Sequence, residues 1–136
     1  MINGELTGTL VLIHPELGHD PAGRRNEIGI IVNSDLENDN ILVSFQDNEH
    51  DLFTSDALLV LLPDDDIHRN LSNMGADAAW ADIKALTQID LILRYGSGDK
   101  HFKAMELARD NINIQSLCLD TLQNQINLHI SQGPER

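Results

Sequence analysis

The spacing of apolar residues changes at Pro63, and this change constrains the fold more than any other feature of the sequence. Before Pro63 the apolar residues form short β-branched runs separated by turn-forming residues, which is typical of strands. After Pro63 they recur every three or four residues, which is the period of an amphipathic helix. We therefore expect an α+β protein, with a strand-rich domain at residues 1–63 and a helical unit at residues 64–136.

Four or five short strands are expected in the first domain, at residues 8–14, 27–33, 40–46, 50–54 and 57–62. On the two-residue period of a half-buried sheet, the second and third strands each supply three core residues. These are Ile28, Ile30, Val32, Ile41, Val43 and Phe45. Ile31 and Leu42 are expected on the opposite face.

The order of these strands and loops carries a resemblance. The apolar run "LVLIHP" precedes a long loop, "GIIVN" follows it, and "ILVSFQDNEHDLFTSDALLVL" reads as three more strands with a short turn at "TSD". Short strands of this kind avoid exposed edges best by closing into a small barrel. Residues 6–62 resemble the SH3-like small β-barrels, a class that includes the Tudor and KOW types. The resemblance implies a small antiparallel barrel and identifies no functional residue.

Three or four helices are expected after Pro63. Asp64, Asp65 and Asp66 suit the positive N-terminus of the first, which ends at Gly75. Asp77 is the expected cap of the second, which either continues to Tyr95 or restarts near Thr87.

Asp99 is the expected cap of the third helix, and the last helix is expected at residues 114–130. Because the junction at residues 63–66 is short, the helical unit is predicted to dock on the barrel.

The net charge of −13 limits the classes of partner. Through residue 63, eleven acidic residues face only Arg24 and Arg25. Such a surface repels nucleic-acid phosphates and anionic lipids, so we expect neither nucleic-acid nor membrane binding. The longest apolar run, residues 57–62, is too short to span a bilayer, and the N-terminus lacks the pattern of a secretory signal, so a cytoplasmic protein is expected. The single cysteine, Cys118, rules out an intramolecular disulfide and is expected to be a buried apolar residue.

One loop combines several metal-ligating residue types. His14, His19 and Asp20, with His50 from a later strand, offer the nitrogen and oxygen ligands that zinc or nickel binds. The five-residue spacing of the two loop histidines matches no established zinc pattern, however. The favoured interpretation is that His14 closes a strand and Asp20 begins a turn, and no cofactor is expected.

Three further residues are candidates for binding. Arg24 and Arg25 could hold a carboxylate of a partner, or they could pair with Glu27, Asp35 or the acids at 64–66. Trp80 is a candidate anchor for a partner, because interfaces are enriched in Trp, although core packing is the commoner role at such a position.

No motif joins a nucleophile to a base, so no catalytic residue is proposed, although convergence of distant residues would escape this test. The first hypothesis is a non-enzymatic interaction or regulatory protein that binds a protein partner, preferably a basic one, through barrel loops or a helical surface. The second is a metal- or small-ligand-binding protein that uses the loop from His14 to Asp20 with His50. The third is a structural subunit that homo-oligomerises through its last helix.

Overall fold

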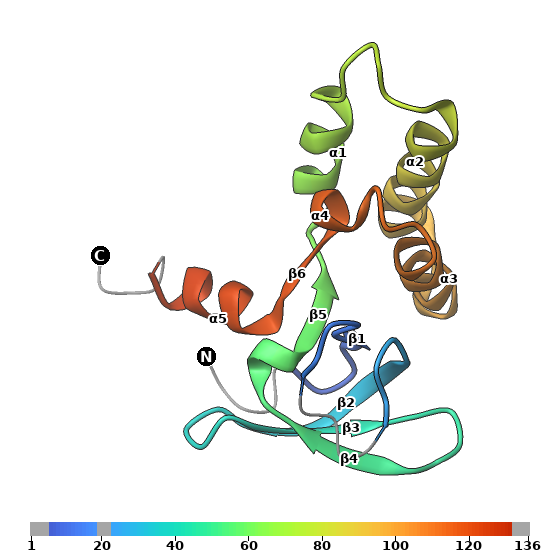
Figure 1. Ribbon diagram of the computed structural model, residues 1–136. Helices are drawn as coiled ribbons and strands as arrows, with labels where there is room; N and C mark the ends of the chain where they lie inside the picture. Colours follow the sequence, from blue (N-terminus) through green and yellow to red (C-terminus); the bar gives the residue numbers. More distant parts are fainter. Residues whose placement is uncertain (1–5, 19–22, 132–136) are drawn as a thin grey trace. The chain divides into compact units, whose positions relative to one another are not determined.

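The computed structural model describes residues 6–18 and 23–131 (Figure 1). The chain divides into two compact units. One contains the residues up to Val60 together with those from Asp120 onward, and the other contains Leu61–Leu119. The division between Val60 and Leu61 therefore lies close to Pro63, where the apolar spacing changes. The residues from Asp120 onward belong to the strand-rich unit again.

The strands form one six-stranded sheet with the order β4-β3-β2-β1-β5-β6. Their bounds are Leu10–Ile13 for β1, Ile28–Asp35 for β2, Asn40–Ser44 for β3, His50–Phe53 for β4, Leu58–Leu61 for β5 and Leu119–Thr121 for β6. The pairs β1–β2, β1–β5, β2–β3 and β3–β4 are antiparallel. All five strands expected before Pro63 are confirmed. Their ends were predictable because turn residues interrupt the β-branched runs close to the observed ends.

The expected closure into a barrel is not observed. The strand order is linear, and β4 and β6 are its two edges. The outer edge of β5 pairs with β6, which comes from the C-terminal part of the chain and was not expected as a strand. What the structure establishes is an α+β fold with a six-stranded sheet and five α-helices among the described residues.

The expected faces of β2 are wrong over part of the strand. Ile30 and Val32 are 42% and 37% exposed, whereas Ile31 is fully buried. The register of β2 against β3 shifts between Ile31 and Asn33, which is the signature of a β-bulge. The regular pairing of β1 with β2 also places Gly29 opposite Val11, so Gly29 and Ile31 share the core face.

The core of the first unit is aliphatic with two aromatic rings. Ile41, Val43 and Phe45 are buried as expected, and the Phe45 and Phe53 rings meet edge to face with centroids 6.0 Å apart. Leu122 and Ile126 of α5 (Leu122–Ser131) belong to the same cluster. The unit therefore consists of strands with one C-terminal helix packed into their core.

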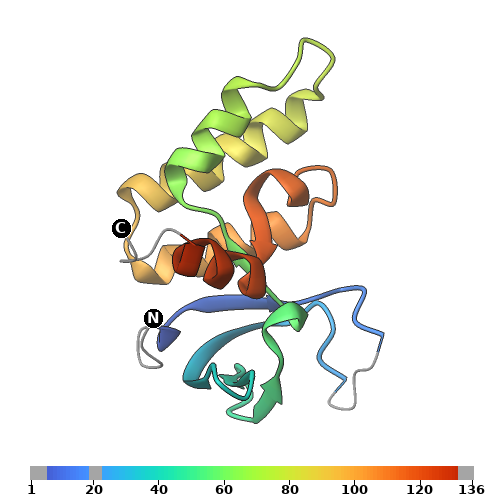
Figure 2. The same ribbon diagram turned by 90° about the vertical axis from the view of Figure 1, so that its left-hand side faces the viewer.

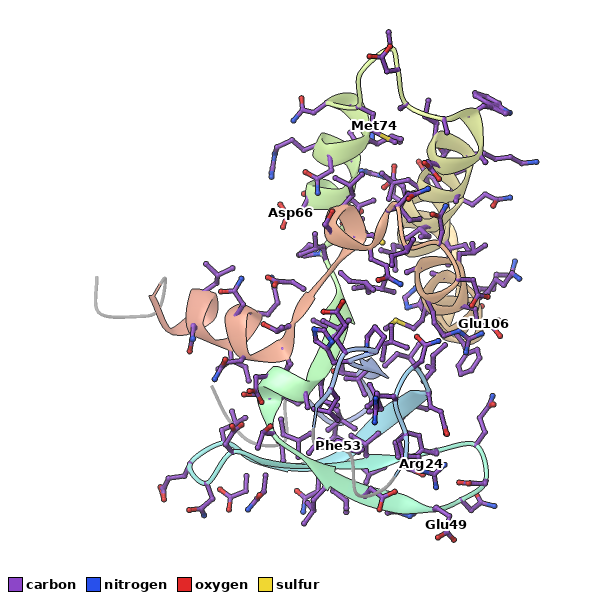
Figure 3. All side chains as sticks on the ribbon, in the orientation of Figure 1. Arg24, Glu49, Phe53, Asp66, Met74 and Glu106 are labelled. Atoms are coloured by element: carbon purple, nitrogen blue, oxygen red, sulfur yellow. The ribbon has the colours of Figure 1, made fainter. Side chains whose placement is uncertain are left out.

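The second unit is helical. Its helices are α1 (Asp64–Ser72), α2 (Trp80–Tyr95), α3 (Gly98–Arg109) and α4 (Gln115–Cys118). Figure 2 shows α1 and α2 lying side by side, and Figure 3 labels Asp66 in the first turn of α1 and Met74 just beyond its last residue. The fully buried side chains in this unit include Ile67, Leu86, Ile89, Met105 and Ile114.

The helix α2 is continuous from Trp80 to Tyr95, which resolves the alternative left open by the sequence. The Thr87 hydroxyl donates to the Ile83 carbonyl oxygen at 2.7 Å, so it bonds the preceding turn instead of capping a new helix. The expected cap Asp77 is wrong, because the segment before Ala79 forms a turn and Ala79 is the N-cap. Likewise Ser97, and not Asp99, is the N-cap of α3.

The last helix is not continuous over residues 114–130 as expected. It is interrupted by β6, and the Thr121 hydroxyl accepts from the backbone N–H of Asn124 at 3.1 Å. This is an N-terminal cap for α5. The Asp120 carboxylate adds hydrogen bonds from the side-chain amides of Asn124 and Gln125. Polar side chains at 120 and 121 thus start α5.

Candidate interaction site

The exposed face of α2 presents large apolar side chains to solvent. Trp80 is 74% exposed, Leu91 50% and Tyr95 79%. At 100° per residue these three positions fall within one stripe that also contains Lys84 and Gln88, both exposed. We call these five residues the α2 stripe, and its length along the axis is about 22 Å.

The opposite face of α2 explains why the stripe is exposed. Leu86, Ile89 and Asp90 are buried and point away from the stripe. The helix is apolar on both faces, so burying one face within the unit leaves the other without cover. A soluble surface rarely collects Trp, Leu and Tyr on one stripe without an interaction to make.

A group of charged residues joins α1 to α2. The Asp90 carboxylate is 3.2 Å from His68 Nδ1 and 3.4 Å from Arg94 Nε. Arg94 is also 3.8 Å from Asp64 and from Asp65. Sequence reasoning missed this group, because 22 residues separate His68 from Asp90 and only the packing of the two helices brings them together.

The buried carboxylate of Asp90 therefore has the positive charge of Arg94 beside one oxygen and a ring nitrogen of His68 beside the other, and such partners lower the cost of burying it. These contacts link α1 to α2 and stabilise the packing of the two helices. Within the two described ranges, no group of three or more His, Cys, Asp or Glu side chains could hold a metal ion.

Arg24 binds carboxylates of its own chain. Its guanidinium lies 2.9 Å from Glu27, 3.0 Å from Asp47 and 3.3 Å from Asp51, and stands 4.4 Å above the centre of the Phe45 ring. Figure 3 shows Arg24 at the end of the β3–β4 hairpin that also carries Glu49. The pairing with Glu27 that the sequence allowed is observed, and the two aspartates come from the hairpin. Arg25 is exposed beside it.

This arrangement shifts the pKa of the groups involved. The backbone N–H of Glu49 and then the Arg24 guanidinium lower the pKa of Asp47, and hydrogen bonds to Asp47 and Glu27 raise the pKa of Arg24. Arg24 thus fastens the long loop to the hairpin. A partner carboxylate would have to displace these acids.

We expect Arg24→Gln to destabilise the first unit, because three carboxylates lose their shared cation. A folded-state pKa below the unfolded one contributes stability that is present above about pH 4 and is lost as the pH falls through the lowered value. In the variant the Asp47 contribution shrinks but persists, since the Glu49 N–H remains. Urea unfolding at pH 7, 4 and 3 measures both effects.

The matched control for this variant is Lys84→Gln, which removes the same charge from an exposed residue of α2. It is expected to change the unfolding midpoint far less. Equal losses in the two variants would contradict a specific role for the Arg24 contacts and indicate a general charge effect.

Two of the candidate metal ligands, His14 and His50, lie within the described residues. His14 follows β1, and its Nδ1 accepts from the backbone N–H of Glu16 at 3.1 Å, which uses that nitrogen to close a turn. His50 begins β4 and is exposed. His19 and Asp20 lie outside the described residues.

Cys118 is fully buried, as expected, and its thiol lies 3.3 Å from the Ile114 carbonyl oxygen. Burial raises the pKa of this thiol to about 12, so it remains protonated at neutral pH and is a poor nucleophile. Among the helices of the described ranges, none has the length and apolar character needed to cross a membrane.

Comparison with known proteins adds no relative. No protein family, no curated protein and no solved structure matches the chain.

Proposed function

We propose that this protein is a non-enzymatic interaction protein that docks on a protein partner through the α2 stripe. The exposure of Trp80 and Tyr95 at the two ends of one helix face is the observation that carries the proposal. Trp and Tyr dominate the energetics of interfaces because they bury large surfaces at little cost in side-chain entropy. Leu91 adds an aliphatic contact between them.

The polar members of the stripe and the charge of the chain bear on the partner. Lys84 and Gln88 lie between the aromatic ends and would meet acceptor groups of the partner. The net charge of −13 favours a partner that is basic overall, because the field of the whole chain accelerates such an encounter. A basic protein with an apolar groove that carries acceptor groups fits both requirements.

The proposal also includes the architecture of the strands in the first unit. We infer that the strands of the first unit are a variant of the SH3-like architecture in which a sixth strand occupies the edge of β5. Two observations support this likeness: the order β4-β3-β2-β1-β5 of the N-terminal strands, and the short 3-10 turn η2 (Ser55–Ala57) between β4 and β5. Small barrels and sheets of this type commonly serve as binding modules.

We expect Trp80→Ala and Tyr95→Ala each to weaken partner binding by about tenfold or more, the loss typical of an interface anchor. The full chain serves as bait in a cell extract, and the retained protein is purified and titrated against wild type and variants. Because Trp80 is the only tryptophan, its quenching by acrylamide reports directly on whether the partner covers it.

The control variant is Ile112→Ala, since Ile112 is 80% exposed but lies outside α2. It should bind as wild type does. A partner that binds all variants equally, or that leaves Trp80 as open to the quencher as before, would overturn the proposal. Sedimentation of the free chain separates this proposal from homo-oligomerisation, because a self-associating stripe would give a dimer that Trp80→Ala dissolves.

A further inference from the structure

A half-open cavity of about 480 Å³ lies in the first unit, between the β2–β3 turn, the η2 turn and α5. This volume is within the range of small-ligand sites, which is roughly 300–1,000 Å³. Its apolar wall consists of Leu36 and Ile126, and Ile126 is anchored in the core of the unit. All the elements around the cavity belong to the same compact unit.

Two carboxylates give the cavity its charge. Glu37 and Asp39 of the β2–β3 turn line it, and no Lys, Arg or His is among its described lining residues. Asp39 has a φ of 54°, and its Oδ1 accepts from the backbone N–H of Ser55 at 2.9 Å. This hydrogen bond fixes the carboxylate against η2 and leaves Oδ2 for a ligand.

Neutral polar groups complete the wall. Gln123 and Asn127 of α5 line the cavity. Ser55 lines it while being only 5% exposed. Its backbone N–H donates to the Asp39 carboxylate, which holds Ser55 at the cavity wall. The Ser55 hydroxyl can donate or accept a hydrogen bond, so it adds a neutral polar group to the wall.

We propose that this cavity binds a primary ammonium group carried on an apolar chain. An ammonium has three donors and no acceptor, which matches two carboxylates, a hydroxyl and the amide oxygens. The alkyl chain would pack on Leu36 and Ile126. Anionic ligands are disfavoured by Glu37, by Asp39 and by the acidic residues that dominate this half of the chain. The proposal is independent of the α2 stripe.

Two sources can supply this group, a free alkyl diamine or a lysine side chain of another protein. The full chain is titrated with 1,5-diaminopentane and, separately, with a neutral-capped tripeptide that has lysine at its centre, while backbone amide NMR shifts are recorded. Tighter binding of the diamine identifies a free amine as the ligand, and tighter binding of the peptide identifies a lysine side chain. Pentanol and glutarate serve as neutral and anionic probes of similar length.

Binding should shift the amide signals of the turn at 36–39 and of the first turns of α5. Asp39→Asn and Glu37→Gln should each weaken binding by roughly fivefold, the upper range for a partly exposed ion pair. Asn tolerates positive φ and retains an oxygen for the Ser55 N–H, so Asp39→Asn is expected to fold, and Glu37 is exposed. The matched control is Glu49→Gln, which removes one exposed charge from the β3–β4 turn.

Three results would overturn the proposal. The first is that neither cationic probe binds, and the second is that pentanol or glutarate binds as tightly as the diamine. The third is that Glu49→Gln weakens binding as much as the two cavity variants do. The last result would show general attraction to an acidic surface. Loss of partner binding in Trp80→Ala with unchanged diamine binding would confirm that the two sites are separate.

Discussion

Replacing Ile31 with Ala is expected to lower the free energy of unfolding by about 2–5 kcal/mol, the range for truncating a fully buried Ile. Ile31 is 0% exposed and belongs to the core cluster of the first unit. The cost has two parts, the lost transfer of the apolar atoms from water and the cavity left among neighbours that close only in part.

The neighbouring substitution Ile30→Ala is the matched control, because it removes the same atoms one position away. Ile30 is 42% exposed, and the expected cost is at most about 1 kcal/mol. Urea unfolding measures both, and unchanged slopes with denaturant would show that the denatured state is not the origin of the difference.

The reverse ranking, with Ile30→Ala the more damaging substitution, would contradict the observed register. It would support the strict alternation that the sequence alone predicts, with Ile28, Ile30 and Val32 on the core face. This pair of variants therefore tests which residues of β2 face the core, the point on which the sequence-based prediction was wrong.

The reason for that error is physical. The run "GIIVN" places apolar residues on both faces, so its composition does not identify the buried one. The face is decided by pairing partners: Gly29 lies opposite Val11, and the register against β3 shifts after Ile31. In and just after β3, where Leu42 is the only apolar residue at the alternate positions, the same reasoning succeeded for Ile41, Val43 and Phe45.

The boundaries of helices and strands were predictable where local residues set them and not where a distant strand does. Turn residues and the change of period at Pro63 are local signals, and the strands and the start of α1 follow from them. The break at β6 depends on a distant strand, because β6 pairs with the edge of β5 some sixty residues earlier in the chain. The capping pattern at Asp120 and Thr121 was a readable local signal for the start of α5.

The candidate sites depended most on long-range packing. Arg24 meets Asp47 and Asp51 across 23 and 27 residues, so the sequence could offer Glu27 as a partner but not the hairpin acids. The exposure of Trp80 was equally inaccessible, because a helix that is apolar on both faces does not reveal which face the rest of the unit covers.

Adding one methyl group at Gly29 is expected to destabilise the protein by about 1–3 kcal/mol or more, although Ala is intrinsically favoured over Gly in a strand. A Cβ at this position would collide with the Cγ1 atom of Val43 and lie 2.9 Å from the Ser44 carbonyl oxygen. It would also approach Phe45 Cδ1 to 3.2 Å. The absence of a side chain at Gly29 thus allows β2 and β3 to pack as they do.

Two further variants separate this close approach from a general effect of replacing glycine. Gly18→Ala should be nearly neutral, because a Cβ there meets no atom within 4 Å. Val43→Ala, costly alone, should recover part of the loss when combined with Gly29→Ala, since it removes the first collision and leaves the one with the Ser44 backbone. Strictly additive losses in the double variant would contradict contact between positions 29 and 43. Thermal and urea unfolding of the four proteins, measured alongside wild type, decide between coupling and additivity, and a positive coupling would confirm that this glycine sets the spacing of β2 and β3.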